Sequence, residues 1–294
     1  MKLVYLGSPE MAVPPLRALV GAGHEVLLVV TNPPRRRGRR SAASGTPVAL
    51  AAEELGLTVT HEPDDILGVD AELGVVVAYG RIIKPHLLDH TRMVNLHFSL
   101  LPRWRGAAPL ERAILEGDRE TGVCLMEVEE GLDTGGVLAR EVVRIEPGTT
   151  ATELRGRLVD IGSDMLLSAL SGPLGEPVAQ PETGVTYAEK IQPAELELDW
   201  QRSAEEVDRV VRVGGAWTTL DGRRIKVLQA RPLDADDPNM PGVTGHPGKL
   251  VGKVVLCGNG ALELDQLQPE GKGPMAAQAF LNGARLVDGT RLGT

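Results

Sequence analysis

Three polar side chains in the middle of the sequence have the types and spacing that chemistry at a carbonyl group requires. Asn95 and His97 begin the irregular stretch NLHFSLLPRWRGAAP, and Asp133 lies in the glycine-rich stretch GLDTGG. An amide can donate to a developing oxyanion, an imidazole can move a proton, and a carboxylate can orient and stabilise an imidazolium. The set therefore predicts addition and elimination at a carbonyl carbon.

The same residues also fit an interpretation without chemistry. A single His is more often a satisfied polar residue than a catalyst, and glycines beside an Asp are typical of a tight turn. Spacing alone leaves both interpretations open. The position of the residues in the fold has to decide between them.

Motifs for several other chemistries are absent from the sequence. No nucleophile stands beside a base as in a catalytic triad, and no two histidines share a helical face as zinc ligands do. The stretch GSPEMA lacks the G-x-G-x-x-G fingerprint of dinucleotide sites, and no Walker-type phosphate loop occurs. The sequence thus argues against a nicotinamide or a nucleoside triphosphate, and it predicts no metal.

The elements that would position these residues alternate along the first half of the chain. Short apolar strands are expected at 2–6, 25–30, 73–78 and 92–96, with helices at 15–23 and 47–56. This alternation predicts an α/β fold with a Rossmann-like parallel sheet covered on both faces. Ligands bind such sheets beyond the carboxyl ends of the strands, which is where Asn95 and His97 lie.

Further elements complete the expected first domain. The pattern predicts a short helix at 110–117, strands at 121–129 and 136–145, and a long helix within 149–172. Thr150 or Thr152 would cap that helix, and Gly172-Pro173 would end it.

The composition and the expected elements of the sequence change near its last third. Residues 172–193 are rich in Pro and Gly and read as a linker, after which a helix is expected at 203–213. Asp221-Gly222 and Gly258-Asn259-Gly260 are turn signals between short strands, which predicts a small β-barrel, OB-like among other options. The expected domains are 1–175, a linker at 176–202, and 203–294.

The composition is that of a globular protein. Apolar residues make up 42% of the chain and charged residues 24%, and no apolar run approaches the roughly 18 residues of a membrane span. The start MKLVYLGSPE is expected to be a strand, not a signal peptide. Cys124 and Cys257 stand far apart in apolar runs, as buried free thiols do. We expect a cytoplasmic protein without a membrane partner.

The charge is unevenly distributed. The net charge is −9, yet no Asp or Glu occurs between Glu25 and Glu53 or between Asp89 and Glu111. The first of these windows holds the run RRRGRR. Basic patches in an acidic chain predict a specific polyanionic partner.

A longer stretch carries a resemblance to a known family. Residues 95–138 resemble the signature region of the 10-formyltetrahydrofolate-dependent formyltransferases, which share Asn-x-His, an SLLP loop and the Asp of G-x-D-T-G. The stretch SLLPRWRGAAP is similar to the methionyl-tRNA formyltransferase branch. The similarity extends to VVVAYGRII, TYAEKI, GAWTTLDGRRIKV and QPEGKGPMAAQAFLNGAR.

The resemblance implies roles for individual residues. Asn95, His97 and Asp133 would be catalytic. The folate would contact Ser99, Leu100, Leu101 and Pro102, in a pocket that Tyr79 and Gly80 help to line. The tRNA acceptor stem would meet the basic loop with Arg35, Arg36, Arg37, Arg39 and Arg40. The sequence departs from the family here, with Gly38-Arg39-Arg40-Ser41 in place of a Gly-Arg-Gly-Lys-like core.

The resemblance also implies the reaction and its partners. A formyl group would pass from 10-formyltetrahydrofolate to the α-amino group of initiator methionyl-tRNA, in a monomer whose C-terminal barrel adds tRNA surface. Glycinamide ribonucleotide or an amino sugar nucleotide is the alternative acceptor. A formyltetrahydrofolate hydrolase would be expected to carry an N-terminal regulatory domain, and a non-catalytic RNA-binding module would leave the Asn, His and Asp set unexplained.

Overall fold

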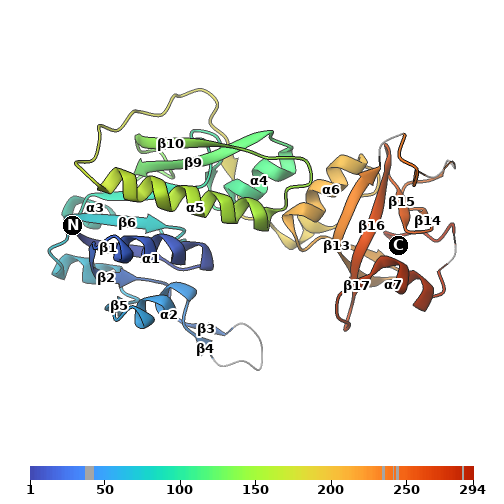
Figure 1. Ribbon diagram of the computed structural model, residues 1–294, viewed down its shortest axis with the longest axis horizontal. Helices are drawn as coiled ribbons and strands as arrows, with labels where there is room; N and C mark the ends of the chain where they lie inside the picture. The colour runs from blue at the N-terminus through green and yellow to red at the C-terminus, as the bar shows by residue number, and fades with distance from the viewer. Residues whose placement is uncertain (37–42, 234–235, 241, 243–244, 287) are drawn as a thin grey trace. The chain divides into compact units, whose positions relative to one another are not determined.

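The computed structural model describes residues 1–36, 43–233, 236–240, 242, 245–286 and 288–294 (Figure 1). The chain divides into two compact units. The first unit comprises Met1–Leu110, Glu120–Arg144 and Glu153–Lys190, and the second comprises Glu111–Arg119, Ile145–Thr152 and Ile191–Thr294. Each unit is therefore assembled from separate stretches of the chain.

The first unit is built on a seven-stranded sheet with the order β10-β9-β7-β6-β1-β2-β5. Its strands are β1 (Lys2–Gly7), β2 (Glu25–Val30), β5 (Val59–Thr60), β6 (Leu73–Val77), β7 (Met93–His97), β9 (Glu120–Glu127) and β10 (Val137–Arg144). Neighbours from β5 to β7 pair in parallel, whereas β9 and β10 add an antiparallel edge. Every residue of β6 is buried, as expected of a parallel strand covered on both faces. The predicted α/β sheet is confirmed.

Helices cover this sheet. They are α1 (Val13–Gly21), α2 (Pro47–Glu54), α3 (Pro85–His90) and α5 (Ala151–Leu170), with the 3-10 turns η1 (Glu10–Ala12) and η2 (Pro63–Gly68). Most of α4 (Pro109–Glu116) belongs to the second unit. The long helix α5 begins directly after Thr150, one of the two predicted caps. A Cβ on its Gly162 would lie 3.3 Å from Val123 and 3.5 Å from Leu96, so α5 packs closely on β9 and β7. The sequence missed α3 and β5, which are too short to show a period.

The second unit contains a six-stranded antiparallel sheet with the order β12-β13-β16-β15-β14 and β17 paired to β16. Its strands are β12 (Trp217–Leu220), β13 (Arg223–Leu233), β14 (Leu250–Val251), β15 (Val254–Leu256), β16 (Ala261–Pro269) and β17 (Met275–Ala276), with η3 (Pro193–Leu196), α6 (Ala204–Val213) and α7 (Ala277–Gly283). The predicted turn residues Asp221 and Gly222 have φ of 49° and 72°, the positive values that a two-residue hairpin turn requires. The antiparallel domain is thus confirmed, and closure into a barrel stays a prediction.

The helix α6 joins the separate stretches of the second unit. Its Arg209 donates from Nη1 to the carbonyl of Leu115 at 3.3 Å, and its Arg212 donates from Nη1 to the carbonyl of Thr149 at 3.1 Å. Arg212 also pairs with the buried Asp208 at 2.7 Å. The two early stretches are therefore bound into this unit through side chains that come late in the sequence.

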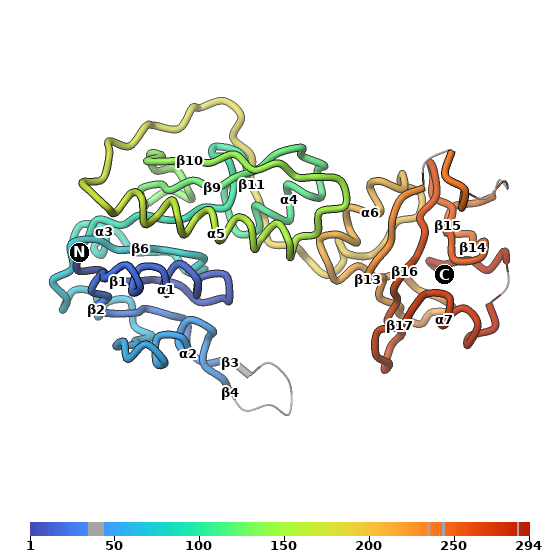
Figure 2. Tube along the Cα trace, viewed as in Figure 1, coloured from blue at the N-terminus to red at the C-terminus, as the bar shows by residue number. Residues whose placement is uncertain are grey.

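The segment expected to be a linker is divided between the units. The first unit continues to Lys190 and the second begins at Ile191, whereas the sequence predicted a linker over 176–202. Figure 2 traces the chain from the end of α5 to β11 (Tyr187–Ala188), which pairs in parallel with β8 (Arg105–Gly106). The polar, Pro- and Gly-rich composition of this segment indicated a linker. The segment instead makes hydrogen bonds to a loop far away in the sequence, and no local pattern reveals such bonds.

Candidate active site

The strand β7 presents Asn95 and His97 on the same face of the sheet, because alternate residues of a strand point the same way. Pairing with β9 sets Asn95 opposite Met126 and His97 opposite Cys124. The His97 side chain is buried and Asn95 is half-buried. Burial raises the pKa of the Cys124 thiol, so this neighbour stays uncharged. The strand end thus holds an amide and an imidazole side by side.

Both ring nitrogens of His97 face a protein oxygen. Nε2 lies 2.9 Å from the carbonyl oxygen of Trp104, and Nδ1 lies 3.6 Å from Oδ2 of Asp133. A carbonyl can only accept, so we assign a proton to Nε2. Nδ1 is then the nitrogen that can gain or lose a proton, and it faces a carboxylate at ion-pair distance.

The loop after β7 is folded tightly on itself. Ser99 donates from Oγ to the carbonyl of Arg103 at 2.6 Å, and the Leu101–Pro102 peptide bond is cis. Ser99 and Leu101 are buried, while Leu100 and Pro102 are half-buried. Trp104 has a φ of 65°, and its ring packs under the Arg103 guanidinium at 4.4 Å. The tryptophan is thus a packing residue whose carbonyl orients His97.

The Asp133 side chain is held by a backbone hydrogen bond. Its Oδ2 accepts from the backbone N–H of Gly106 at 2.7 Å, and its own φ is 51°. A Cβ on Gly135 would lie 2.1 Å from the carbonyl oxygen of Glu127, so only glycine fits there. The three predicted catalytic residues lie in one unit, and the structure brings His97 and Asp133 together.

Two further residues contact this site from the segment expected to be a linker. Thr186 accepts at Oγ1 from the backbone N–H of Trp104 at 2.9 Å. Gln180 donates to the carbonyls of Asp133 and Gly135, both at 2.8 Å, and accepts from Arg105. Sequence reasoning missed both residues. The similarity of TYAEKI to the family was the available signal, since Thr186 begins that stretch.

Polar residues at neighbouring strand ends form a second group. Asn32, after β2, donates from Nδ2 to Oγ of Ser8 and to the carbonyl of Tyr79, each at 2.9 Å. The Tyr79 ring packs in the apolar core, where burial raises the pKa of its phenol, and Gly80 is exposed with a φ of 73°. Ser8 and Asn32 follow the carboxyl ends of β1 and β2. That position in the sequence could have identified them as candidate site residues.

The predicted basic loop is described only in part. Arg35 and Arg36 form β3 (Arg35–Arg36), which pairs with β4 (Ala43–Ser44). Arg37, Arg39 and Arg40 lie outside the described residues.

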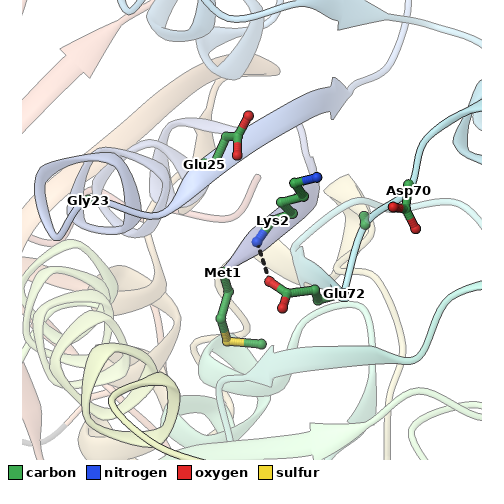
Figure 3. Close-up of a pocket in the computed structure, with 7 residues that line it drawn as sticks. Met1, Lys2, Gly23, Glu25, Asp70 and Glu72 are labelled. Carbon is green, nitrogen blue, oxygen red and sulfur yellow. Dashed lines mark hydrogen bonds between the residues drawn. The ribbon is translucent and has the colours of Figure 1, made fainter.

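A pocket lies at the opposite edge of the sheet, at the amino ends of β1, β2 and β6. Figure 3 shows its lining by Met1, Lys2, Gly23, Glu25, Asp70 and Glu72, with the backbone N–H of Lys2 bound to Glu72 Oε2 at 2.5 Å. Open α/β sheets bind ligands at the carboxyl ends, so this pocket does not belong to the site. In the described part of the chain, no three His, Cys, Asp or Glu are grouped to hold a metal, and no helix could span a membrane.

Comparison with known proteins places the chain in a family. Residues 1–170 match the family model described as formyl transferase, and residues 190–285 match the one described as formyl transferase, C-terminal domain. The chain belongs to the formyl transferase family, an expectation raised by residues 95–138. Its relatives include the methionyl-tRNA formyltransferase of Roseobacter denitrificans, 47% identical over 99% of this chain and 98% of that protein. The methionyl-tRNA formyltransferase of Gluconobacter oxydans is 42% identical over 99% of this chain and 100% of its own.

Solved structures share the fold at lower identity. The N-formyltransferase of Helicobacter canadensis, in complex with folinic acid and dTDP-3-aminofucose, superposes with a TM-score of 0.68 at 15% identity, over 90% of this chain and 99% of its own. HypX of Aquifex aeolicus, in complex with tetrahydrofolic acid, gives a TM-score of 0.66 at 18% identity. The match covers 96% of this chain and 47% of HypX, so this chain spans about half of that protein.

Proposed function

We propose that this chain transfers the formyl group of 10-formyltetrahydrofolate to the α-amino group of methionine on initiator methionyl-tRNA. The observation that carries the proposal is the buried His97 with Nδ1 3.6 Å from Asp133, at the carboxyl end of β7 beside Asn95. Methionyl-tRNA formyltransferases that match this chain over nearly its whole length support the choice of acceptor.

The arrangement suits direct transfer. The neutral amine attacks the formyl carbon, a new C–N bond forms, and the bond from that carbon to N10 of the folate breaks. Asn95 donates to the formyl oxygen as it gains negative charge, the positive charge of protonated His97 stabilises that oxygen, and Asp133 pairs with the imidazolium at Nδ1. The proton lost by the amine passes to Asp133, directly or through a water, and returns to N10 of the leaving tetrahydrofolate.

The residues around the site fit a folate substrate. Half-buried Leu100 and Pro102 follow the catalytic strand, and exposed Gly80 follows the neighbouring strand β6. Leu100 and Pro102 offer apolar side chains to the folate, and Gly80 offers an exposed backbone. Ser99 and Leu101 are buried and support the conformation of the loop. Because the Tyr79 ring packs in the core, its contribution to the folate pocket is made through the backbone.

The tRNA is proposed to contact both units. In the second unit, the hairpin of β12 and β13 exposes Arg223, Arg224 and Lys226, with the Arg224 guanidinium 3.6 Å from the centre of the Trp217 ring. In the first unit, the acid-free run from Arg35 to Arg40 supplies the remaining positive charge. Replacing Arg39 and Arg40 with Ser should raise KM for tRNA and reduce the salt slope by roughly 0.7–0.9 per lost phosphate contact. An unchanged KM and slope would exclude the loop.

Acceptor choice is tested in one assay. The purified chain is incubated with labelled 10-formyltetrahydrofolate and, in parallel, with charged initiator tRNA, glycinamide ribonucleotide or a dTDP-amino sugar. We expect label on methionyl-tRNA alone. Label on either small amine without label on tRNA would replace this proposal by the alternative acceptor.

The setting of the reaction is part of the proposal. An enzyme of translation initiation works in the cytoplasm, and we propose a monomer there. Sedimentation of the purified chain at micromolar concentration tests the monomer, and a dimer would contradict it.

A further inference from the structure

We propose that Gln180 and Thr186 are positioning residues that hold the His97–Asp133 pair in its reactive geometry. The inference rests on the proposed function for its kinetic part. It assigns a role to the last segment of the first unit, which ends at Lys190 and whose composition resembles that of a linker.

Thr186 acts on His97 through the two peptide units that meet at Trp104. Its Oγ1 accepts from the N–H of Trp104 at 2.9 Å, and the carbonyl of the same residue accepts from Nε2 of His97 at 2.9 Å. The next residue, Arg105, donates from its backbone N–H to the carbonyl of Thr186 at 2.9 Å. Thr186 thus fixes the direction of the carbonyl that sets the His97 tautomer.

Gln180 acts on Asp133 in a similar way. Its amide nitrogen donates to the carbonyls of Asp133 and Gly135, both at 2.8 Å. Its Oε1 accepts from Nε and Nη2 of Arg105 at 3.1 and 2.7 Å. A glutamine side chain carries two N–H donors and one acceptor oxygen, and here all of them are used. Glutamate lacks the donors, and lysine or arginine lacks the acceptor.

Trp104 and Asp133, which these hydrogen bonds hold, both have an unfavourable backbone conformation. Trp104 and Asp133 have φ of 65° and 51°, a region that costs non-glycine residues about 1–3 kcal/mol and persists only when neighbours enforce it. The bonds from Thr186 and Gln180 supply that enforcement at both residues. One short segment therefore orients both members of the catalytic pair.

A glycine in the loop after β7 allows the segment that contains Thr186 to approach closely. Gly106 has a φ of 119°, and a Cβ there would lie 2.9 Å from the carbonyl oxygen of Ala188. Ala107 and Ala108 donate to the same carbonyl at 2.8 and 3.1 Å. Gly106 also donates to Asp133 Oδ2 at 2.7 Å, so the segment, the loop and the catalytic carboxylate form one network.

The test compares isosteric with conservative variants. Thr186→Val keeps the shape and removes the acceptor, whereas Thr186→Ser keeps the acceptor. Gln180→Met removes all three hydrogen-bonding groups, and Gln180→Glu keeps only the acceptor. Tyr187→Phe and Glu182→Gln are matched controls, because both side chains are exposed neighbours in the same segment.

The kinetic readout separates positioning from folding. We expect Thr186→Val, Gln180→Met and Gln180→Glu to lower kcat about 10- to 100-fold, with KM for both substrates within twofold of wild type. Thr186→Ser should restore kcat to within threefold, and the controls should keep it. A kcat within twofold of wild type in the Val and Met variants, or a Ser variant as slow as the Val variant, would overturn the proposal.

A second readout does not depend on activity. Nitrogen-15 spectra of labelled histidine report the hydrogen bond at Nε2 of His97, identified among the six histidines by its loss in His97→Asn. We expect the Nε2 resonance to move in Thr186→Val and to return in Thr186→Ser. An unmoved resonance overturns the role of Thr186. If the wild-type chain transfers no formyl group to methionyl-tRNA, the proposed function fails, and these spectra still decide the positioning role.

Discussion

Replacing Asp133 by Asn tests the electrostatic part of the mechanism. The asparagine oxygen can still accept from the N–H of Gly106, so the turn is kept and only the charge is lost. At the 3.6 Å separation of Nδ1 and Oδ2, and an effective dielectric of about 20, a full imidazolium–carboxylate attraction is about 4.6 kcal/mol. That corresponds to a factor of about 2,000 in rate. Because the Asp133 side chain is 16% exposed, solvent screens part of this attraction. We therefore expect kcat of Asp133→Asn to fall about 10²- to 10³-fold.

The assay is single-turnover formyl transfer with labelled donor and saturating methionyl-tRNA, which isolates the chemical step. Glu129→Gln is the control, since it removes a nearby exposed carboxylate that is outside the pair. The Asp133→Asn variant should unfold at the wild-type temperature. If it turns over within threefold of wild type, no charge on His97 needs stabilising in the transition state, and the role given to Asp133 is wrong.

Three further outcomes are expected. Asn95→Ala should lower kcat about 10²- to 10³-fold at unchanged thermal midpoint, and a smaller loss in single turnover would remove it from the oxyanion site. Ser203→Ala breaks the capping box with Glu206 at the start of α6 and should cost about 1 kcal/mol in a denaturant titration, with formyl transfer unchanged. The hydrogen bonds from Arg112 lower the pKa of Glu195 below 4.5, so the pair stabilises fully above that pH and is lost as the pH falls through the lowered value. Glu195→Gln should therefore flatten the fall of the unfolding temperature on acidification, and an unaltered slope would contradict the pairing.

Much of the fold followed from the sequence because its strands are continuous apolar runs and its turns carry glycine. The runs at 25–30 and 73–78 became β2 and β6, and Asp221-Gly222 became a hairpin turn. The position of Asn95 and His97 followed from a physical rule, since ligands bind parallel sheets at the carboxyl ends of the strands. Asp133 was grouped with them by its chemistry and by the family resemblance, because it follows β9, which runs antiparallel to β7. The family resemblance then narrowed the chemistry.

The remainder depended on contacts between residues far apart in the chain. Gln180 is 47 residues from Asp133, and Thr186 is 82 residues from Trp104. Hydrogen bonds of this kind leave no period and no composition bias, so the segment that makes them resembled a linker. The role of Trp104, whose carbonyl directs the imidazole, likewise depends on a contact that the sequence does not show.

The way the second unit is assembled has a consequence for biosynthesis. Glu111–Arg119 and Ile145–Thr152 are translated long before Arg209 and Arg212, which bind their carbonyls. A nascent chain that has completed only the first unit carries these two stretches without their arginine partners, and a fragment starting at Ile191 lacks them altogether. These contacts in the second unit therefore form only after α6 has been synthesised, and a cut between Lys190 and Ile191 would separate the second unit from two of its own stretches.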